Sequence, residues 1–340
     1  RYNYAYCITP TLDENFIIAG LENDDDVYLL KIKPNGDTLW TKTFGNGHDW
    51  ATAITPTIDG NFIVVGFTSS FGVERNVYLL KIKPNGDTLW TKTYGRNRSD
   101  YYDYAQAITP TPDGNYIIAG YIKSFGVDSS EVYLLKIKSD GDTLWTKTYG
   151  GADWDNAYAI TPTPEGNCIV AGYTKSFGVG SSDVYLLNIK PNGDTLWTKT
   201  YGGAGWDDAS AITPASDGNF IVAGSTKSFG AGSNDFYLLK IKPDGDTLWT
   251  KTYGGTGYDG AKAITPTPDG NFIVAGYTTS FGTGGGDIWL ISIIDDRYAK
   301  KDSLFTFKIS VSGDSLSHGY SPLKVHSGMT VSPGGCHRAL

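Results

Sequence analysis

The chain has 340 residues, of which 40% are hydrophobic and 19% charged, and its formal net charge is −8. This length exceeds the size at which one hydrophobic core usually stops growing, so the chain either divides into domains or spreads its core over repeated units. The acidic balance and the lack of a Lys/Arg cluster argue against nucleic-acid binding. The longest apolar runs, such as 288–294, are too short to span a bilayer, so we expect no membrane insertion.

Two short motifs recur along the whole chain and define six tandem copies. Ile-Thr-Pro occurs six times, beginning at Ile8, Ile54, Ile108, Ile160, Ile212 and Ile264. Gly-Asp-Thr-Leu-Trp occurs five times, ending at Trp40, Trp90, Trp145, Trp197 and Trp249. The sixth copy ends in the degenerate run Asp302-Ser303-Leu304-Phe305-Thr306. The chain is therefore a tandem repeat of units of about 52 residues.

Each copy contains four predicted strands, which we name a to d and place here in the fifth copy. They cover residues 211–214, 219–224, 236–242 and 247–253. Asp217-Gly218 joins a to b and Asp244-Gly245 joins c to d, and both dipeptides favour two-residue hairpin turns. The unit is therefore predicted to be a meander of antiparallel strands.

Strand positions within the unit follow from polarity. Strand b is apolar on both faces, as in Phe62-Ile63-Val64-Val65, so both faces of its sheet must be covered. Strand a contains a proline and strand d alternates Thr and Lys with Leu and Trp, which is typical of edges. Repeated sheets with two edges and two covered faces close into a ring of blades. We predict an all-β, six-bladed β-propeller over residues 1–308, with a non-repeating tail over 309–340. An open β-solenoid is the alternative.

The repeat also resembles a known group of proteins. Asp-Gly-Asn-Phe-Ile-Val-Ala-Gly-Tyr-Thr, then Asp-Val-Tyr-Leu-Leu-Lys-Ile, then Gly-Asp-Thr-Leu-Trp-Thr-Lys-Thr-Tyr-Gly-Gly is similar to the propeller repeats of secreted bacterial and archaeal proteins. The resemblance covers residues 2–308. It implies a propeller fold and a location outside the cell or at the cell surface, but no particular activity, because propellers host many functions.

The d–a loops carry a recurring pair of an aromatic residue and an aspartate. The pairs are Tyr102-Asp103, Trp154-Asp155, Trp206-Asp207 and Tyr258-Asp259. One interpretation is a ring of sugar sites, in which the aromatic ring stacks on a pyranose and Asp accepts hydroxyl hydrogen bonds. A second is structural: Asp ties its loop to backbone amides and the ring packs between blades. Calcium binding is a third, and the acidic run 22–26 could also ligate Ca²⁺ or be a solvated loop.

Catalysis should appear as a departure from the repeat, because one active site needs one set of residues. The departures are few, namely His48, Trp50, residues 74–76 and the longer third d–a loop. Three of the four histidines lie in the tail, and no metal-binding cluster or nucleophile motif is visible. We therefore predict no enzymatic activity, no catalytic residues, no metal and no cofactor. Paired carboxylates facing each other across the central opening would make a glycan-cleaving enzyme the alternative.

The ends of the repeat array raise the question of closure. The sixth copy supplies its own strand d, so blades one and six should meet mainly through face packing. A disulfide between Cys7 and Cys336 could staple this seam, and Cys168 is expected to be a buried thiol. The tail could fold back on the disc, or it could add a strand to a neighbouring molecule.

The most favoured function from the sequence is a structural or interaction module outside the cell or at its surface. Its expected partners are further copies of itself or other surface proteins, and self-assembly could use the tail. A multivalent carbohydrate-binding propeller, with glycans as ligands, is the alternative.

Overall fold

The computed structural model describes residues 3–22, 26–70, 75–95, 102–123, 129–282, 285–294 and 305–307. These residues form 24 strands in six separate four-stranded antiparallel sheets, which confirms the predicted six-bladed β-propeller. Each sheet is one blade, and its strands are hydrogen-bonded in chain order. The Cys336 side of the predicted disulfide and the tail 309–340 lie outside the described residues.

The first three blades have these strand bounds. Blade 1 contains β1 (Asn3–Pro10), β2 (Phe16–Glu22), β3 (Asp26–Ile32) and β4 (Thr38–Phe44). Blade 2 contains β5 (Asp49–Pro56), β6 (Phe62–Thr68), β7 (Asn76–Ile82) and β8 (Thr88–Tyr94). Blade 3 contains β9 (Tyr102–Pro110), β10 (Tyr116–Lys123), β11 (Ser130–Ile137) and β12 (Thr143–Tyr149).

The last three blades repeat the pattern. Blade 4 contains β13 (Asp155–Pro162), β14 (Cys168–Thr174), β15 (Asp183–Ile189) and β16 (Thr195–Tyr201). Blade 5 contains β17 (Asp207–Pro214), β18 (Phe220–Thr226), β19 (Asp235–Ile241) and β20 (Thr247–Tyr253). Blade 6 contains β21 (Asp259–Pro266), β22 (Phe272–Thr278), β23 (Asp287–Ile293) and β24 (Phe305–Phe307).

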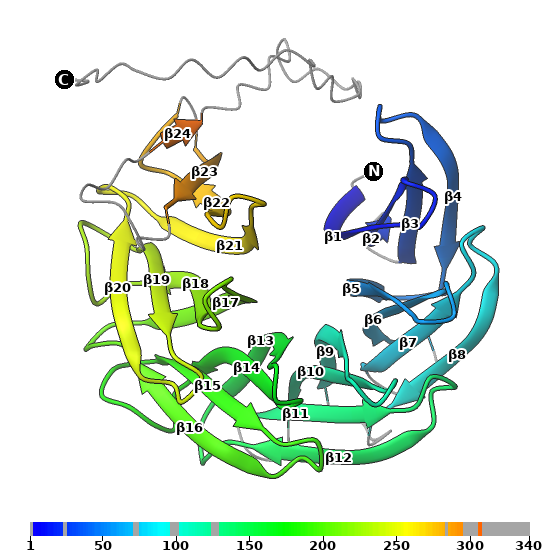
Figure 1. The fold of residues 1–340 in the computed structure, drawn as a ribbon, viewed down its shortest axis with the longest axis horizontal. Coiled ribbons are helices and arrows are strands. Elements are labelled where there is room, and N and C mark those ends of the chain that lie inside the picture. The colour runs from blue at the N-terminus through cyan, green and yellow to red at the C-terminus, as the bar shows by residue number, and fades with distance from the viewer. Residues whose placement is uncertain are drawn as a thin grey trace.

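The blades stand side by side around a centre, with the first strand of each blade innermost and the fourth outermost (Figure 1). This arrangement confirms that strands a and d are the edges. The hairpin turns differ in detail from the prediction. At Asp244-Gly245, Gly245 N–H donates to Lys242 O and Lys242 N–H donates to Asp246 O, each at 2.9 Å. This is a three-residue loop that ends on a glycine at φ +83°, a backbone conformation that glycine adopts without strain.

The hydrophobic core lies between blades rather than within one. Five clusters of buried side chains each join two successive blades, from the seam of blades 1 and 2 to that of blades 5 and 6. In the first seam, Ile17 and Leu29 of blade 1 pack with Phe62, Val64 and Leu80 of blade 2. Strand b can therefore be apolar on both faces, because each face meets a neighbouring blade.

Blades 6 and 1 do not form such an interface among the described residues. No buried cluster joins them, and Figure 1 shows the ring open between β21 and β1. The prediction that these two blades meet through face packing is therefore wrong for this structure. As far as the described residues go, one face of blade 1 and one face of blade 6 therefore have no neighbouring blade packed on them.

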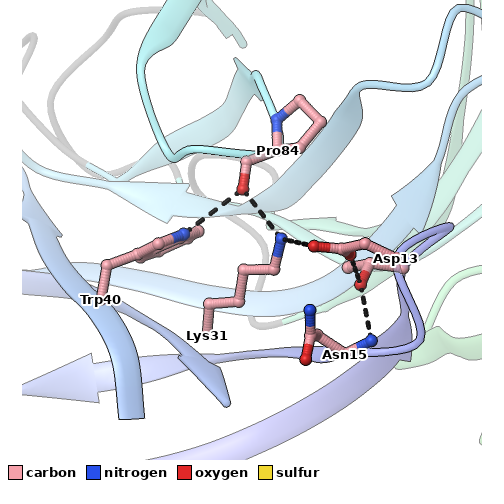
Figure 2. Close-up of polar contacts among 6 residues, drawn as sticks. Asp13, Asn15, Lys31, Trp40 and Pro84 are labelled. Carbon is pink, nitrogen blue, oxygen red and sulfur yellow. Dashed lines mark hydrogen bonds and ion pairs between the residues drawn. The ribbon is translucent and has the colours of Figure 1, made fainter. Parts of the chain in front are cut away.

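At the outer rim, the first four seams each have a Lys–Asp contact of the same kind, and Figure 2 shows polar contacts of the first seam. In the first seam, Trp40 Nε1 and Lys31 Nζ both donate to Pro84 O at 3.3 Å, and Lys31 also forms an ion pair with Asp13 at 2.8 Å. Lys42 lies two residues after Trp40 and pairs with Asp87 at 2.8 Å. We call the contacts of a strand-d Trp and Lys with the next blade's c–d turn the rim latch.

Two of the cysteines lie in the described part of the chain as free thiols. Cys7 packs into the cluster between blades 1 and 2, and its burial raises the pKa of the thiol to about 12. Cys168 is buried as predicted, and burial raises its pKa to about 12 as well. Cys7 therefore contacts the first seam, while the predicted pairing with Cys336 stays a prediction.

Candidate functional site: the central pocket

The four aspartates of the predicted aromatic–Asp pairs begin the inner strands and are buried. Asp155, Asp207 and Asp259 are fully buried, and Asp103 is nearly so. Asp207 shows how they are held: it accepts hydrogen bonds from Gly203 N–H at 2.8 Å and Ser228 Oγ at 2.6 Å, and another from Thr226 Oγ1. Asp155 and Asp259 make the equivalent contacts with their own loops. The carboxylates of Asp155, Asp207 and Asp259 therefore anchor the long loops, which is the structural interpretation, and their burial leaves them no surface to offer a sugar.

Their aromatic partners occupy different surroundings. Trp154 lies beside the ammonium groups of Lys123 and Lys175, at 5.4 and 5.9 Å from its ring centroid. Tyr258 is exposed and lies against Tyr277. Tyr102 stacks against Tyr104, and Trp206 lies against Tyr173. The structure therefore does not gather the predicted residues into equivalent sites.

The centre of the ring is where the six copies differ. The inner strands of blades 2 to 6 share the pattern Asp-x-Ala-x-Ala-Ile-Thr-Pro, and only the two x positions vary freely. The first x is opposite a residue of strand b, as Trp50 is opposite Phe67 and Tyr104 opposite Tyr121. The second x is an extra residue without a partner in the ladder. It falls where the register shifts between strands a and b.

A β-bulge with an extra residue re-aims that side chain, which is a common device next to binding sites. In blade 2 the bulge is permitted by Gly66, because a Cβ there would lie 1.7 Å from Trp50 O. The bulge residue Thr52 reaches across to blade 3, where its hydroxyl donates to Ala105 O at 2.8 Å. The same glycine recurs in every strand b, so the bulge belongs to the repeat while the side chain that it carries is free to differ.

These variable side chains line a cavity of about 580 Å³, which we call the central pocket. Its volume is in the range that holds small ligands. It is lined by Tyr6, Trp50, Thr52, Phe67, Arg75, Tyr104, Gln106, Tyr121, Tyr158, Asp208, Ser210 and Lys262. All are x residues of the inner strands except Phe67, Tyr121 and Arg75. The variable positions lie near the start of the inner strand, so the pocket opens toward the long-loop face.

An arc of aromatic rings forms much of its wall. Successive ring centroids lie 4.8 to 6.5 Å apart across five blades. The rings follow the order Tyr6, Trp50, Phe67, Tyr104, Tyr121, Tyr158, Tyr173 and Trp206. Such an arc offers a large rigid surface at low conformational cost, with hydroxyl groups at its edge.

Charged groups stand at separate points of the pocket. Arg75 donates to Tyr104 Oη at 2.7 Å, and its guanidinium lies 5.2 Å from the Phe67 ring centroid. Asp208 accepts from Ser225 N–H at 3.1 Å and Ser225 Oγ at 3.0 Å. Lys262 is exposed at the blade 6 side. Two cations and one partly satisfied carboxylate therefore surround an apolar arc.

The phenols of Tyr121 and Tyr158 remain protonated at neutral pH. Burial raises the pKa of Tyr121 and of Tyr158 above the ordinary tyrosine value. A general base needs a pKa near the operating pH, so these groups serve as hydrogen-bonding donors and acceptors instead. The chemistry on offer is stacking, hydrogen bonding and charge pairing.

Among the described residues, no three His, Cys, Asp or Glu side chains gather as metal ligands would. Within the same residues, no helix has the length and apolarity needed to cross a membrane. A second cavity, of about 540 Å³, lies between blades 2 and 3 beside Tyr94, Asp103 and Lys147. It adjoins 96–101 and 124–128, which are outside the described residues.

Comparisons with known proteins support the fold. A family model for a domain of unknown function, DUF5122, described as a beta-propeller, matches residues 215–247. The regulatory protein FlaEY of Caulobacter vibrioides is 29% identical over 160 residues, which is 41% of this chain and 17% of that protein. The chain thus covers well under two thirds of that relative's length. These findings and the six blades identify a β-propeller repeat protein.

Solved structures give the same result. The periplasmic gluconolactonase PpgL of Pseudomonas aeruginosa matches with a TM-score of 0.55 and 12% identity, over 86% of this chain and 82% of that one. The Pan2 WD40 domain of Neurospora crassa matches with a TM-score of 0.52 and 10% identity, over 80% and 75%. A protein of unknown function from Bacteroides caccae matches with a TM-score of 0.50 and 14% identity, over 82% of this chain and 89% of that one. At these identities the likeness shows the fold alone.

Sequence reasoning missed the central pocket, because it searched the loops for departures from the repeat. Of the lining residues, only Trp50 and Arg75 were among the departures from the repeat noted in the sequence. The signal was present in the aligned inner strands, where two positions vary between fixed Ala and Asp residues. That these variable side chains line one pocket depends on the β-bulge and on how the blades are placed around the ring.

Proposed function

We propose that this protein is a non-enzymatic binding propeller that holds its ligand in the central pocket and works outside the cell or at its surface. The observation that carries the proposal is the location of the differences between copies. Blades that are nearly identical elsewhere differ at the x positions, and most of those side chains line one pocket. A single ligand site on a repeat scaffold needs a set of residues that is not repeated, and the central pocket has such a set.

The site favours binding over catalysis. Asp208 is the only carboxylate among the pocket-lining residues, and it is already hydrogen-bonded to Ser225 and Trp206. A glycan-cleaving enzyme would use two carboxylates on opposite sides of the scissile bond. One structural neighbour is a gluconolactonase, so sugar lactones are among the substrates to test on this chain. Turnover of sugar lactones or aryl glycosides by the purified chain, abolished by Asp208→Asn, would contradict the proposal.

Carbohydrate is the second candidate ligand class, and the aromatic arc favours it. Rings such as Trp50 and Tyr104 can stack on the apolar face of a sugar, while Gln106 and the phenols meet its hydroxyl groups. The sequence alone places such sugar sites on the d–a loops. The buried aspartates leave those loops with the aromatic ring alone, so the central pocket is the better-equipped location.

Binding to arrays of immobilised glycans and peptides separates these ideas. We expect Trp50→Ala to weaken binding on the order of tenfold or more, because stacking worth about 1.4 kcal/mol corresponds to that factor. Trp154→Ala is the matched control, since Trp154 does not line the pocket. Loss with Trp154→Ala and retention with Trp50→Ala would favour the d–a loops instead. Which array responds identifies the ligand class.

Location and assembly are separate parts of the proposal. The support for an extracellular location is the resemblance of the repeat to secreted propellers. Self-assembly through residues 309–340 is kept as a proposal, since that segment lies outside the described residues. Rods or sheets in negative stain that disappear when 309–340 are deleted would support it, and a monodisperse monomer of the full chain would rule it out.

A further inference from the structure

The rim latch closes four successive seams. Its Lys–Asp pair joins Lys42 to Asp87, Lys92 to Asp142, Lys147 to Asp194 and Lys199 to Asp246, at 2.6 to 2.8 Å. In the seam of blades 3 and 4, Trp145 also donates to Pro191 O at 3.1 Å and Tyr149 to Gly193 O at 2.6 Å. The receiving element is always the c–d turn of the next blade. The donors are always on the outermost strand of the blade before it.

Blade 1 has the same receiving turn, and its own ring does not use it. Pro34-Asn35-Gly36-Asp37 is identical to the turns at 84–87 and 191–194. Within the described part of the chain, no side chain from another blade reaches this turn. Asp37 is hydrogen-bonded by Asn35, and its nearest cation is Lys33 of the same turn, 4.0 Å away. Among the described residues, this turn therefore has the acceptor groups of the rim latch but no Trp or Lys donor from another blade.

The apolar face beside this turn is also uncovered. In blade 2, Phe62, Tyr78 and Leu80 are buried because blade 1 packs on them. Their counterparts in blade 1 are Phe16, Tyr28 and Leu30, all only half-buried. Ile8 of the inner strand is 59% exposed. This face has the residues of a seam, but no other blade packs on it within the part of the chain that the structure describes.

Blade 6 exposes the face that, in the other blades, packs against the following blade. Ile273 and Ile288 are 37% and 69% exposed, whereas their counterparts in blade 5, Ile221 and Phe236, are buried in the seam with blade 6. The two uncovered faces are therefore complementary to the two sides of one internal blade.

Blade 6 lacks the groups that would latch onto blade 1. Ser292 occupies the position of Lys240, and the pairing of Ser292 with Phe305 and of Leu290 with Phe307 fixes the rest of the register. Phe305 thus stands in place of Trp249 and Phe307 in place of Lys251. Blade 6 offers neither an indole N–H nor an ammonium group at these positions. A second copy of the chain offers no free set either, because the outer strands of blades 1 to 5 face the next blade of their own ring.

We propose that the opening between blades 6 and 1 is a docking site for one further blade of the same repeat. The chemistry specifies this partner: a four-stranded unit whose outer strand carries Trp-x-Lys-x-Tyr. Its Trp would donate to Pro34 O, its Lys would pair with Asp37 and its Tyr would donate to Gly36 O. Its other face would cover Ile273 and Ile288. The ring would then close with seven blades.

The test adds such a blade to the existing chain. A copy of the sequence 207–256 is fused ahead of Arg1, so that Arg1-Tyr2 complete its d–a loop. We expect Tm to rise by roughly 5 °C, because a full apolar seam becomes buried on each side of the new blade. Binding of the dye ANS, which reports exposed apolar surface, should fall by about half or more. The matched control carries Trp249→Phe and Lys251→Phe in the fused copy only, and should lose most of the rise in Tm. Asp37→Asn in the fused chain should also lose most of that rise.

The unmodified chain provides a second, independent reading. If the opening is uncovered, Ile288→Lys should leave Tm within roughly 2 °C, since this side chain is mostly in solvent. A large drop in Tm, together with no gain from the fused blade, would show that blade 6 closes directly on blade 1 and would overturn the proposal. A concentration-dependent dimer that Ile288→Lys dissolves would overturn it too, because a second copy would then cover the faces.

Discussion

The outer rim and the central pocket are built from the same six copies in opposite ways. At the rim, blade 3 presents Trp145 and Lys147 to its neighbour, and blade 4 presents Trp197 and Lys199 in the same geometry. At the centre, the inner strands of those two blades present different side chains, among them Gln106 and Tyr158. The difference shows that recurring and variable positions of the repeat have different roles. Contacts between neighbouring blades recur from one seam to the next, and the single pocket uses positions at which the copies differ.

The largest effect is expected where a recurring anchor is removed. Asp207→Ala should lower the free energy of unfolding by about 3 kcal/mol or more, because the buried Gly203 N–H and the Thr226 and Ser228 hydroxyls lose their acceptor. Ser210→Ala, on the same strand but in the pocket, should change it by no more than about 0.5 kcal/mol. Urea unfolding measures both. Similar losses for the two variants would break the distinction between recurring anchors and variable pocket residues.

A pH effect of intermediate size is expected from the ion pair that ties strand c to the a–b turn. Burial alone would raise the pKa of Asp217, but hydrogen bonds from Lys240 and Asn219 outweigh it and lower the pKa to about 2. The folded state holds this proton less tightly than the unfolded state does. The ion pair therefore contributes about 2 kcal/mol to the free energy of unfolding above the unfolded pKa of about 4, and this contribution is lost as pH falls toward 2.

Urea unfolding at pH 6, 4 and 2 tests this. The free energy difference between the wild type and Asp217→Asn should be largest at pH 6 and shrink at pH 2. A difference that does not depend on pH would exclude the ion pair as its source.

A smaller effect is expected from a single rim hydrogen bond. Trp145→Phe keeps an aromatic ring but removes the donor to Pro191 O, so stability should fall by about 1 kcal/mol. Trp154→Phe makes the same chemical change at a long-loop position where the structure shows no indole hydrogen bond, and should cost about 0.5 kcal/mol or less. Thermal unfolding of the two variants ranks them. A reversed order would show that the rim latch contributes less than its recurrence suggests.

The smallest expected effect is a gain in stability, at the polar contact between strand c and the a–b turn in which blade 4 differs from its neighbours. Asn188 replaces the usual Lys and Glu165 the usual Asp, and Asn188 Oδ1 and Thr163 Oγ1 are buried without a hydrogen-bonding partner. Restoring the pair with Asn188→Lys and Glu165→Asp together should stabilise the chain by about 0.5 to 1 kcal/mol. Asn188→Lys alone is the control, and it should gain less. A loss in the double variant would show that blade 4 has repacked around its own residues.

The strands were largely predictable, and the exceptions have a physical cause. Residues 247–253 were predicted as strand d and form β20 with the same bounds. Strand a was predicted to begin at Ala211, but β17 begins at Asp207. Aspartate is depleted in strands, so the pattern favoured a loop. Asp207 is in the strand because it pairs with Thr226 across the ladder and its carboxylate is hydrogen-bonded inside the fold.

The sequence by itself determined the six-copy architecture, because a fifty-residue period with two hairpin turns per copy leaves few ways to bury strand b on both faces. It also determined that most of the eye-catching Trp and Asp residues would serve the fold, since they recur with it. Only the tertiary structure decided which positions face the centre and which seam remains open. Both depend on how blades are placed around the ring, where a one-residue bulge turns Thr52 inward and residues more than 250 apart, such as Tyr6 and Lys262, come to line one pocket.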